Sequence, residues 1–93
     1  MKVKINRIGE GLHPNEVVVE VVTSEGKQNL VVDRRAIEDD AISVGAPLQQ
    51  DQDTGLLLVE LPRETMNGAW RVWVKKDNLV PDTRAALYSQ IAK

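Results

Sequence analysis

An acidic stretch, Asp51-Gln52-Asp53-Thr54-Gly55, is the part of the sequence whose spacing comes closest to metal chemistry. An EF-hand calcium loop needs glycine at its sixth position and a bidentate glutamate at its twelfth. Counted from Asp51, Gly55 is the fifth residue and Pro62 is the twelfth. The stretch therefore predicts a polar turn that leads into a strand, and no metal site.

The other reactive side chains lack the partners that catalysis requires. His13 is the only histidine and the chain has no cysteine, which excludes a histidine-dependent triad within one chain, a thiolate nucleophile and a cysteine zinc site. Gly9-Glu10-Gly11 lacks the third glycine of a dinucleotide-binding motif. The carboxylates of Glu38-Asp39-Asp40 are typical of a solvated turn or of a helix N-terminus. We therefore expect no enzymatic activity, no cofactor and no small-molecule substrate.

A tryptophan between two bases is the most suggestive surface feature, with Trp73 flanked by Arg71 and Lys75 on alternate residues. Such a tryptophan can stack a nucleobase or anchor a protein partner. The alternative is structural, with Pro62 packed on the tryptophan and a C-terminal helix lying over both. The predicted interaction surface therefore consists of Trp73, Arg71, Lys75, Pro62, Leu87 and Ile91.

The dipeptide Asn67-Gly68 predicts a hairpin, because a type I′ turn needs positive φ at both central residues. With this dipeptide as the loop, the numbers of paired residues sum to 135. One face then sets Glu64 opposite Arg71, Glu60 opposite Lys75, and Pro62 opposite Trp73. The other face sets Leu61 opposite Val74 and Thr65 opposite Trp70, with Val59 in the same apolar row. This register neutralises the bases beside Trp73, which disfavours a phosphate-binding role.

An earlier hairpin is predicted from two valine-rich strands, Glu16–Thr23 and Asn29–Asp33, around the turn residues 24–27. A four-residue loop sets Val21 opposite Leu30 and Val19 opposite Val32. A three-residue loop with Gly26 left-handed is the alternative, and it pairs Val21 with Asn29. We favour the first, because a slip of one residue exchanges the two faces.

Weaker patterns complete the chain. Residues 2–8 read as an opening strand, Arg35–Ala41 as a single helical turn, and Lys76-Asp77-Asn78 as a short 3₁₀ turn before a strand at Leu79-Val80. The apolar spacing after Pro81 predicts an α-helix over residues 82–92. We expect a single domain over residues 1–93, mainly β in class.

The path from Arg71–Val74 through a tight turn into Leu79-Val80 resembles the end of an SH3-like small barrel, whose last two strands are commonly joined by one 3₁₀ turn. This resemblance implies a five-stranded barrel over residues 2–80. The sequence lacks the aromatic-rich first loop of peptide-binding SH3 domains, so it does not imply a proline-rich ligand. Proteins with this fold serve as accessory subunits, nucleic-acid binders or dimer modules, and the fold alone does not choose among them.

A second segment, Arg7-Ile8-Gly9-Glu10 followed by a valine strand and a glycine turn, is similar to the start of the carbon-storage-regulator RNA-binding proteins. The later segments depart from that family's pattern. RNA or single-stranded DNA binding is therefore the alternative function, and its basic contributors would be Lys2, Lys4, Arg7, Arg34 and Arg35.

Composition separates these alternatives. The formal net charge is −2, which disfavours binding to nucleic acid or to an anionic membrane. The absence of cysteine, of a signal peptide and of a long apolar run predicts a cytoplasmic protein that does not enter the membrane. We therefore predict a non-enzymatic interaction or accessory domain that binds a protein partner or a second copy of itself.

Overall fold

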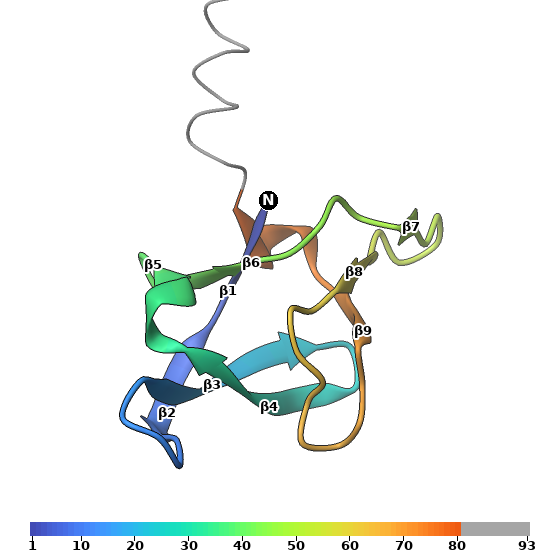
Figure 1. Ribbon diagram of the computed structural model, residues 1–93. Coiled ribbons are helices and arrows are strands. Elements are labelled where there is room, and N and C mark those ends of the chain that lie inside the picture. Colours follow the sequence, from blue (N-terminus) through green and yellow to red (C-terminus); the bar gives the residue numbers. More distant parts are fainter. Residues whose placement is uncertain (81–93) are drawn as a thin grey trace, which may run out of the picture.

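The computed structural model describes residues 1–80 and is built almost entirely from short β-strands (Figure 1). No α-helix occurs within these residues, so the mainly β class is confirmed, while the predicted helix over residues 82–92 lies outside the described part. The elements are β1 (Lys2–Lys4), β2 (Asn6–Glu10), β3 (Glu16–Thr23), β4 (Gly26–Asp33), the 3₁₀ helix η1 (Arg34–Ala36), β5 (Ile37–Glu38), β6 (Ala41–Ser43), β7 (Gln49–Gln50), β8 (Leu57–Glu60), β9 (Arg71–Val74), the 3₁₀ helix η2 (Lys76–Asn78) and β10 (Leu79–Val80).

These strands form three open antiparallel sheets, in the orders β10-β1-β6-β5, β2-β3-β4 and β7-β8-β9. The prediction of five strands is wrong, because the chain passes from one sheet to another at Ile5, between β1 and β2, and because residues 37–50 add three short strands. A backbone hydrogen bond of 2.9 Å from the Ser24 N–H, just after β3, to the Trp73 carbonyl on β9 connects two of the sheets. Another, of 2.8 Å from the Met66 N–H to the Asn29 carbonyl, connects the residues between β8 and β9 to β4.

The last strand of the described part, β10, lies beside the first strand of the chain. The predicted 3₁₀ turn and the strand that follows it are confirmed as η2 and β10. β10 pairs with β1, and Lys2 lies opposite Val80. One strand near the start and one near residue 80 are therefore neighbours in the same sheet.

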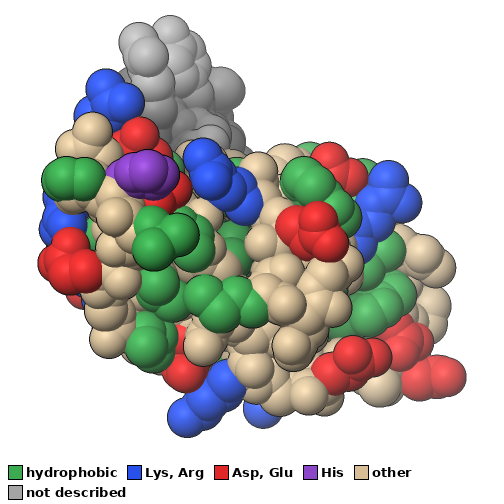
Figure 2. Space-filling model, turned by 60° about the horizontal axis from the view of Figure 1, so that its bottom comes forward, with side chains coloured by type: hydrophobic (Ala, Val, Ile, Leu, Met, Phe, Trp, Pro, Cys, Tyr) green, Lys and Arg blue, Asp and Glu red, His purple; other side chains and the backbone are tan. Residues whose placement is uncertain are grey.

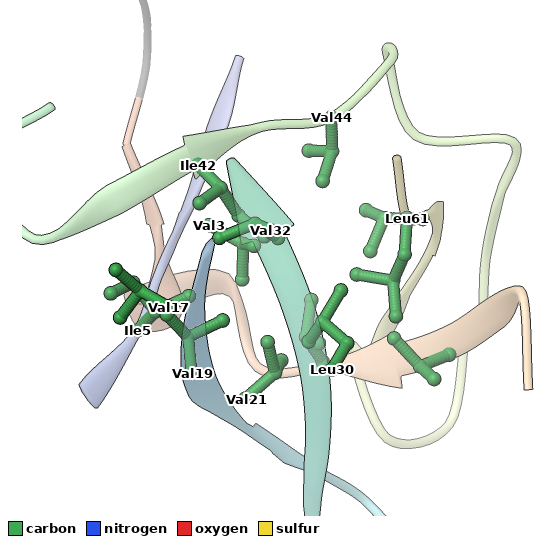
Figure 3. Packing of buried hydrophobic residues seen from close by; sticks show 13 residues of the cluster. Val3, Ile5, Val17, Val19, Val21, Leu30, Val32, Ile42, Val44 and Leu61 are labelled. Carbon is green, nitrogen blue, oxygen red and sulfur yellow. The ribbon is translucent and has the colours of Figure 1, made fainter. Parts of the chain in front are cut away.

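A single cluster of branched aliphatic side chains lies between the sheets, and Figure 3 shows valines from β3 and β4 pointing toward Ile42, Val44 and Leu61. Alternation along each strand produces this arrangement, because every second residue faces inward. Val17, Val19 and Val21 are buried on β3, as Leu30 and Val32 are on β4. Valine is rigid at χ1 and fits a pleated surface, which suits a core with no phenylalanine.

The register of the β3–β4 hairpin differs from the prediction by two residues. Val19 lies opposite Leu30 and Val21 opposite Gln28, with Ser24-Glu25 as a two-residue loop between Thr23 and Gly26. The Thr23 hydroxyl closes this shorter loop, because it donates to the Gly26 carbonyl at 2.7 Å and accepts the Glu25 N–H at 3.2 Å. A shift of two keeps each residue on its predicted face.

The β8–β9 register differs from the prediction by four residues. Glu60 lies opposite Arg71 and Leu58 opposite Trp73, so the predicted pairings with Asn67-Gly68 as a two-residue hairpin loop are wrong. Asn67-Gly68 instead sits in a local turn closed by the Gly68 N–H and the Thr65 carbonyl at 2.9 Å, inside a longer connection over residues 61–70.

Two consecutive aspartates form the two-residue loop between β5 and β6. Asp39 and Asp40 have φ values of 52° and 56°, and Glu38 lies opposite Ala41. Positive φ at both central residues is the requirement of a type I′ turn, and aspartate tolerates it better than most residues. The predicted helical turn over Arg35–Ala41 is therefore wrong in extent, since only η1 is helical and a hairpin follows it.

Gly11 has no room for a side chain, and this gives a stability prediction. A Cβ added to Gly11 would lie 2.5 Å from the Glu16 Cβ, where the Gly11 N–H donates to the Glu16 carbonyl. We expect Gly11→Ala to lower the free energy of unfolding by about 1–3 kcal/mol, measured by urea denaturation. Gly9→Ala is the matched control, because its Cβ meets nothing within 4 Å, and a change within about 0.5 kcal/mol is expected. Equal losses in both variants would contradict the close approach at Gly11.

Candidate interaction surface

The connection over residues 61–70 is held to β4 by a buried hydrogen-bond network centred on Thr65. Its hydroxyl donates to the Gln28 Oε1 at 2.9 Å and accepts the Ala69 N–H at 3.0 Å. The Thr65 N–H also donates to the Ala69 carbonyl at 2.9 Å. Gln28 and Thr65 are the only buried polar residues among those described, so this network fixes the position of the connection.

The connection and β4 together enclose an open groove of about 470 Å³, lined by Val31, Pro62, Arg63, Glu64, Met66 and Trp70. Trp70 keeps 53% of its surface exposed and Met66 keeps 62%. Large apolar side chains in a depression are unusual on a solvated surface and are typical of interaction sites. The groove therefore brings two exposed apolar side chains of the connection next to half-buried Val31, which is distant in sequence.

The outer face of the β2-β3-β4 sheet continues this apolar surface. Val18 lies opposite Val31 on the face that points away from the core, and Val22 and Ile8 are exposed. Figure 2 shows hydrophobic side chains gathered on the side of the molecule formed by these strands. One side of the groove therefore adjoins a sheet face that no other described element covers.

The described residues of the predicted surface do not lie together but border three different depressions. Trp73 is half-buried on β9 beside Arg71, and with Thr23 and Glu25 they border a depression of only about 60 Å³. Pro62 is not opposite Trp73 and lines the groove with Trp70 instead. Lys75 is exposed in a separate hollow of about 550 Å³ that Leu56 also lines. Leu87 and Ile91 lie outside the described residues.

Of the two bases beside Trp73, only Arg71 is neutralised by a carboxylate within residues 1–80. Arg71 is balanced by a carboxylate, but its partner is Glu60, whose Oε2 lies 3.2 Å from the Arg71 Nε, and not Glu64. The predicted pair between Glu60 and Lys75 does not form, because Glu60 lies opposite Arg71. The interaction role of Trp73 itself stays a prediction.

The basic residues that the nucleic-acid hypothesis requires mostly have acidic partners. All five arginines in the described chain make ion pairs: Arg7 with Asp40, Arg34 with Glu10, Arg35 with Asp33, Arg63 with Glu16 and Arg71 with Glu60. Lys2 pairs with Glu38 at 2.9 Å, and Lys4 is exposed. Hydrogen bonds from the Arg35 side chain and N–H lower the pKa of the Asp33 carboxyl below its usual value.

The acidic stretch that suggested calcium forms a turn closed by its own first residue. The Asp51 Oδ2 accepts the Thr54 hydroxyl at 2.7 Å, and its Oδ1 accepts the Asp53 N–H at 3.1 Å. These bonds, led by the one from Thr54, lower the pKa of Asp51 below its usual value. Glu38 and Asp40 pair with different bases, and within residues 1–80 no group of three or more histidine, cysteine or acidic side chains is placed to hold a metal ion.

Sequence reasoning missed Trp70 as a surface residue because the assumed hairpin register set it opposite Thr65 in the apolar row. The available signal was Pro62, which has no N–H for a continuous strand ladder. A bulge or long connection beginning there would have freed Trp70 from strand pairing. The structure shows this outcome, since β8 ends at Glu60 and β9 begins at Arg71.

Comparisons with protein-family models, with curated proteins and with solved structures gave no match to this chain. No helix among the first 80 residues is long and apolar enough to cross a membrane. Assignment of a function therefore depends on the surface itself.

Proposed function

We propose that this protein is a non-enzymatic interaction domain that binds a protein partner through the groove beside β4. The observation behind this proposal is the pair of exposed apolar side chains, Trp70 and Met66, that line the groove with Val31 and Pro62. Tryptophan is enriched at binding hot spots because it buries a large rigid surface with little loss of conformational freedom.

The way the groove is built supports a binding role, because its walls are fixed parts of the fold. Its walls are a strand of the valine-rich sheet and a connection fixed by the Thr65 network, so the backbone that carries Trp70 and Met66 is positioned before any partner arrives. Preorganisation of this kind reduces the entropy lost on binding.

We further propose that the domain belongs to the SH3-like small barrels in the broad sense. Support comes from η2, which joins β9 to β10, and from the pairing of β10 with β1. The backbone hydrogen bond from Ser24 to Trp73 joins the end of β3 to β9, and the one from Met66 to Asn29 joins the connection over residues 61–70 to β4, around one core. Such folds host many interaction modules, so the groove and not the fold decides the function.

The ion pairs favour a protein partner over nucleic acid. Binding to phosphates depends on cations that can replace counterions. The five arginines of the described chain are already engaged by carboxylates, and the groove contains more apolar than basic groups.

The test is to truncate Trp70 and measure the affinity for an identified partner. The wild-type protein captures candidates from a lysate of its native cells, and each candidate is purified and titrated against wild type and Trp70→Ala. We expect Trp70→Ala to weaken Kd by about 30-fold or more, the effect of losing a hot spot worth about 2 kcal/mol.

Two variants make this test specific. Leu12→Ala removes an apolar side chain that is 96% exposed and lies outside the groove, and we expect it to leave Kd unchanged. Trp73→Ala examines the surface predicted from the sequence. If every partner binds folded Trp70→Ala as tightly as wild type, the groove is not the binding site, and a selective loss in Trp73→Ala would place it on β9.

A further inference from the structure

The two charged residues that line the groove, Arg63 and Glu64, differ in their ion pairing. Arg63 lines the groove, but its Nη1 lies 3.9 Å from the Glu16 Oε2, and its charge also contributes to the lowered pKa of Asp33. Glu64 lines the same groove, is exposed, and has no cationic partner within residues 1–80. The groove therefore presents one carboxylate without an ion-pair partner among the described residues, while its base lies near the carboxylate of Glu16.

A second carboxylate lies on the adjoining sheet face. Glu20 is half-buried on the outer face of β3, opposite Asn29, whose carbonyl accepts the Met66 N–H at the end of the groove. Its Oε1 accepts a long hydrogen bond of 3.4 Å from the Asn6 Nδ2, and no base of the described chain pairs with it. The outer sheet face that carries Val31 thus also carries a carboxylate with no ion-pair partner among the described residues.

We propose that the partner presents a peptide segment in which an apolar anchor is flanked by lysine or arginine, with the anchor against Trp70 and the base beside Glu64. This inference rests on the proposed function of the groove. An apolar or acidic partner would leave the Glu64 carboxylate partly desolvated and unpaired, which is costly, whereas a cation supplies the missing charge. A second copy of this chain would bring the same unpaired carboxylates to the interface, so self-association through this face is disfavoured.

Selection from a random peptide library tests the proposal with the protein as it is. Twelve-residue peptides displayed on phage are selected on wild type and counter-selected on Trp70→Ala, so that the retained sequences depend on the groove. We expect lysine or arginine to be enriched within about three residues of an apolar residue, the spacing that reaches across one or two pleats of an extended chain.

Charge reversal then tests whether the peptides use the Glu64 carboxylate. Synthetic copies of the enriched peptides are titrated against wild type, Glu64→Lys and Asp53→Lys, the last being an exposed acidic residue outside the groove. Glu64→Lys is expected to weaken Kd by about tenfold, and the loss should shrink at high salt. Asp53→Lys is expected to change Kd by less than about twofold.

The possible outcomes separate this inference from the proposed function. Peptides that depend on Trp70 but show no basic enrichment, or that bind Glu64→Lys as well as wild type, overturn the inference and leave the groove as a binding site. A library that yields no peptide dependent on Trp70 overturns both. Light scattering that shows a dimer lost in Trp70→Ala would establish self-association in place of a basic partner.

Discussion

Replacing Leu30 by alanine is expected to lower the free energy of unfolding by about 2–5 kcal/mol, a large share of the stability of a small domain. Leu30 has no exposed surface and lies on β4 opposite Val19, within the aliphatic cluster (Figure 3). Its neighbours are mainly valines on paired strands, which have few alternative rotamers and cannot fill the cavity. Urea denaturation followed by linear extrapolation gives the loss directly.

Val22→Ala is the control for this prediction. Val22 is on the neighbouring strand β3 but points away from the core and is exposed. Its truncation removes a β-branched side chain without opening a cavity, so a loss below about 1 kcal/mol is expected. Similar losses for Leu30→Ala and Val22→Ala would mean that the inward and outward faces of the hairpin are assigned wrongly.

Replacing Thr65 by valine is expected to cost about 2–4 kcal/mol, although the two side chains have nearly the same shape. The change removes the hydroxyl that donates to Gln28 and accepts the Ala69 N–H, so a buried amide oxygen and a backbone donor lose their partner. Each buried group left without a hydrogen bond costs about 1–3 kcal/mol. Chemical denaturation of the variant measures the sum.

A double-mutant cycle with Gln28→Met isolates the hydrogen bond itself. When both side chains are apolar, no polar group of the pair remains unsatisfied, so the double variant should be less destabilised than the sum of the single variants by about 1 kcal/mol. Strict additivity would show that the bond between Thr65 and Gln28 does not contribute. Weaker binding in Thr65→Val at temperatures where it stays folded would link the network to the shape of the groove.

Alternating hydrophobicity predicted which side of each strand faces the core but not which residues pair. Val19, Val21 and Leu30 are buried as expected in the first hairpin, and Val59, Leu61 and Val74 are buried in the second. The observed registers nevertheless differ from the predicted ones by two and four residues. Because side chains alternate with a period of two, any even shift leaves the pattern satisfied.

Hydrogen bonds of particular side chains determine which of these equivalent registers forms. Thr23 closes a two-residue loop with its hydroxyl, and Thr65 fixes the connection after β8 through Gln28, a residue distant in sequence. The positive φ pair expected at Asn67-Gly68 occurs at Asp39-Asp40. Local turn propensity is a weak constraint when a buried tertiary hydrogen bond competes with it. The 3₁₀ turn at η2 depends on neighbours in sequence, and it was predicted correctly.

The sequence predicted the type of surface, one centred on a tryptophan, but not the residues that form the groove. The sequence indicated a tryptophan-centred surface on the second hairpin, and the structure places an exposed tryptophan there, but it is Trp70 and its groove includes Val31 from another hairpin. Contacts between residues 31 and 70 depend on the connection over residues 61–70 leaving the strand ladder. No periodic pattern in a single sequence contains that information.

The pairing of β1 with β10 has a practical consequence for the orientation of the domain. Lys2 and Val80 are neighbours at one end of the molecule, while the connection over residues 61–70 and the β2-β3-β4 sheet lie at the other (Figure 1). A tether or a fused protein attached at residue 1 therefore lies at the opposite end of the molecule from the connection that lines the groove. Immobilisation on a sensor surface through the N-terminus would therefore place this connection at the end of the molecule away from the surface.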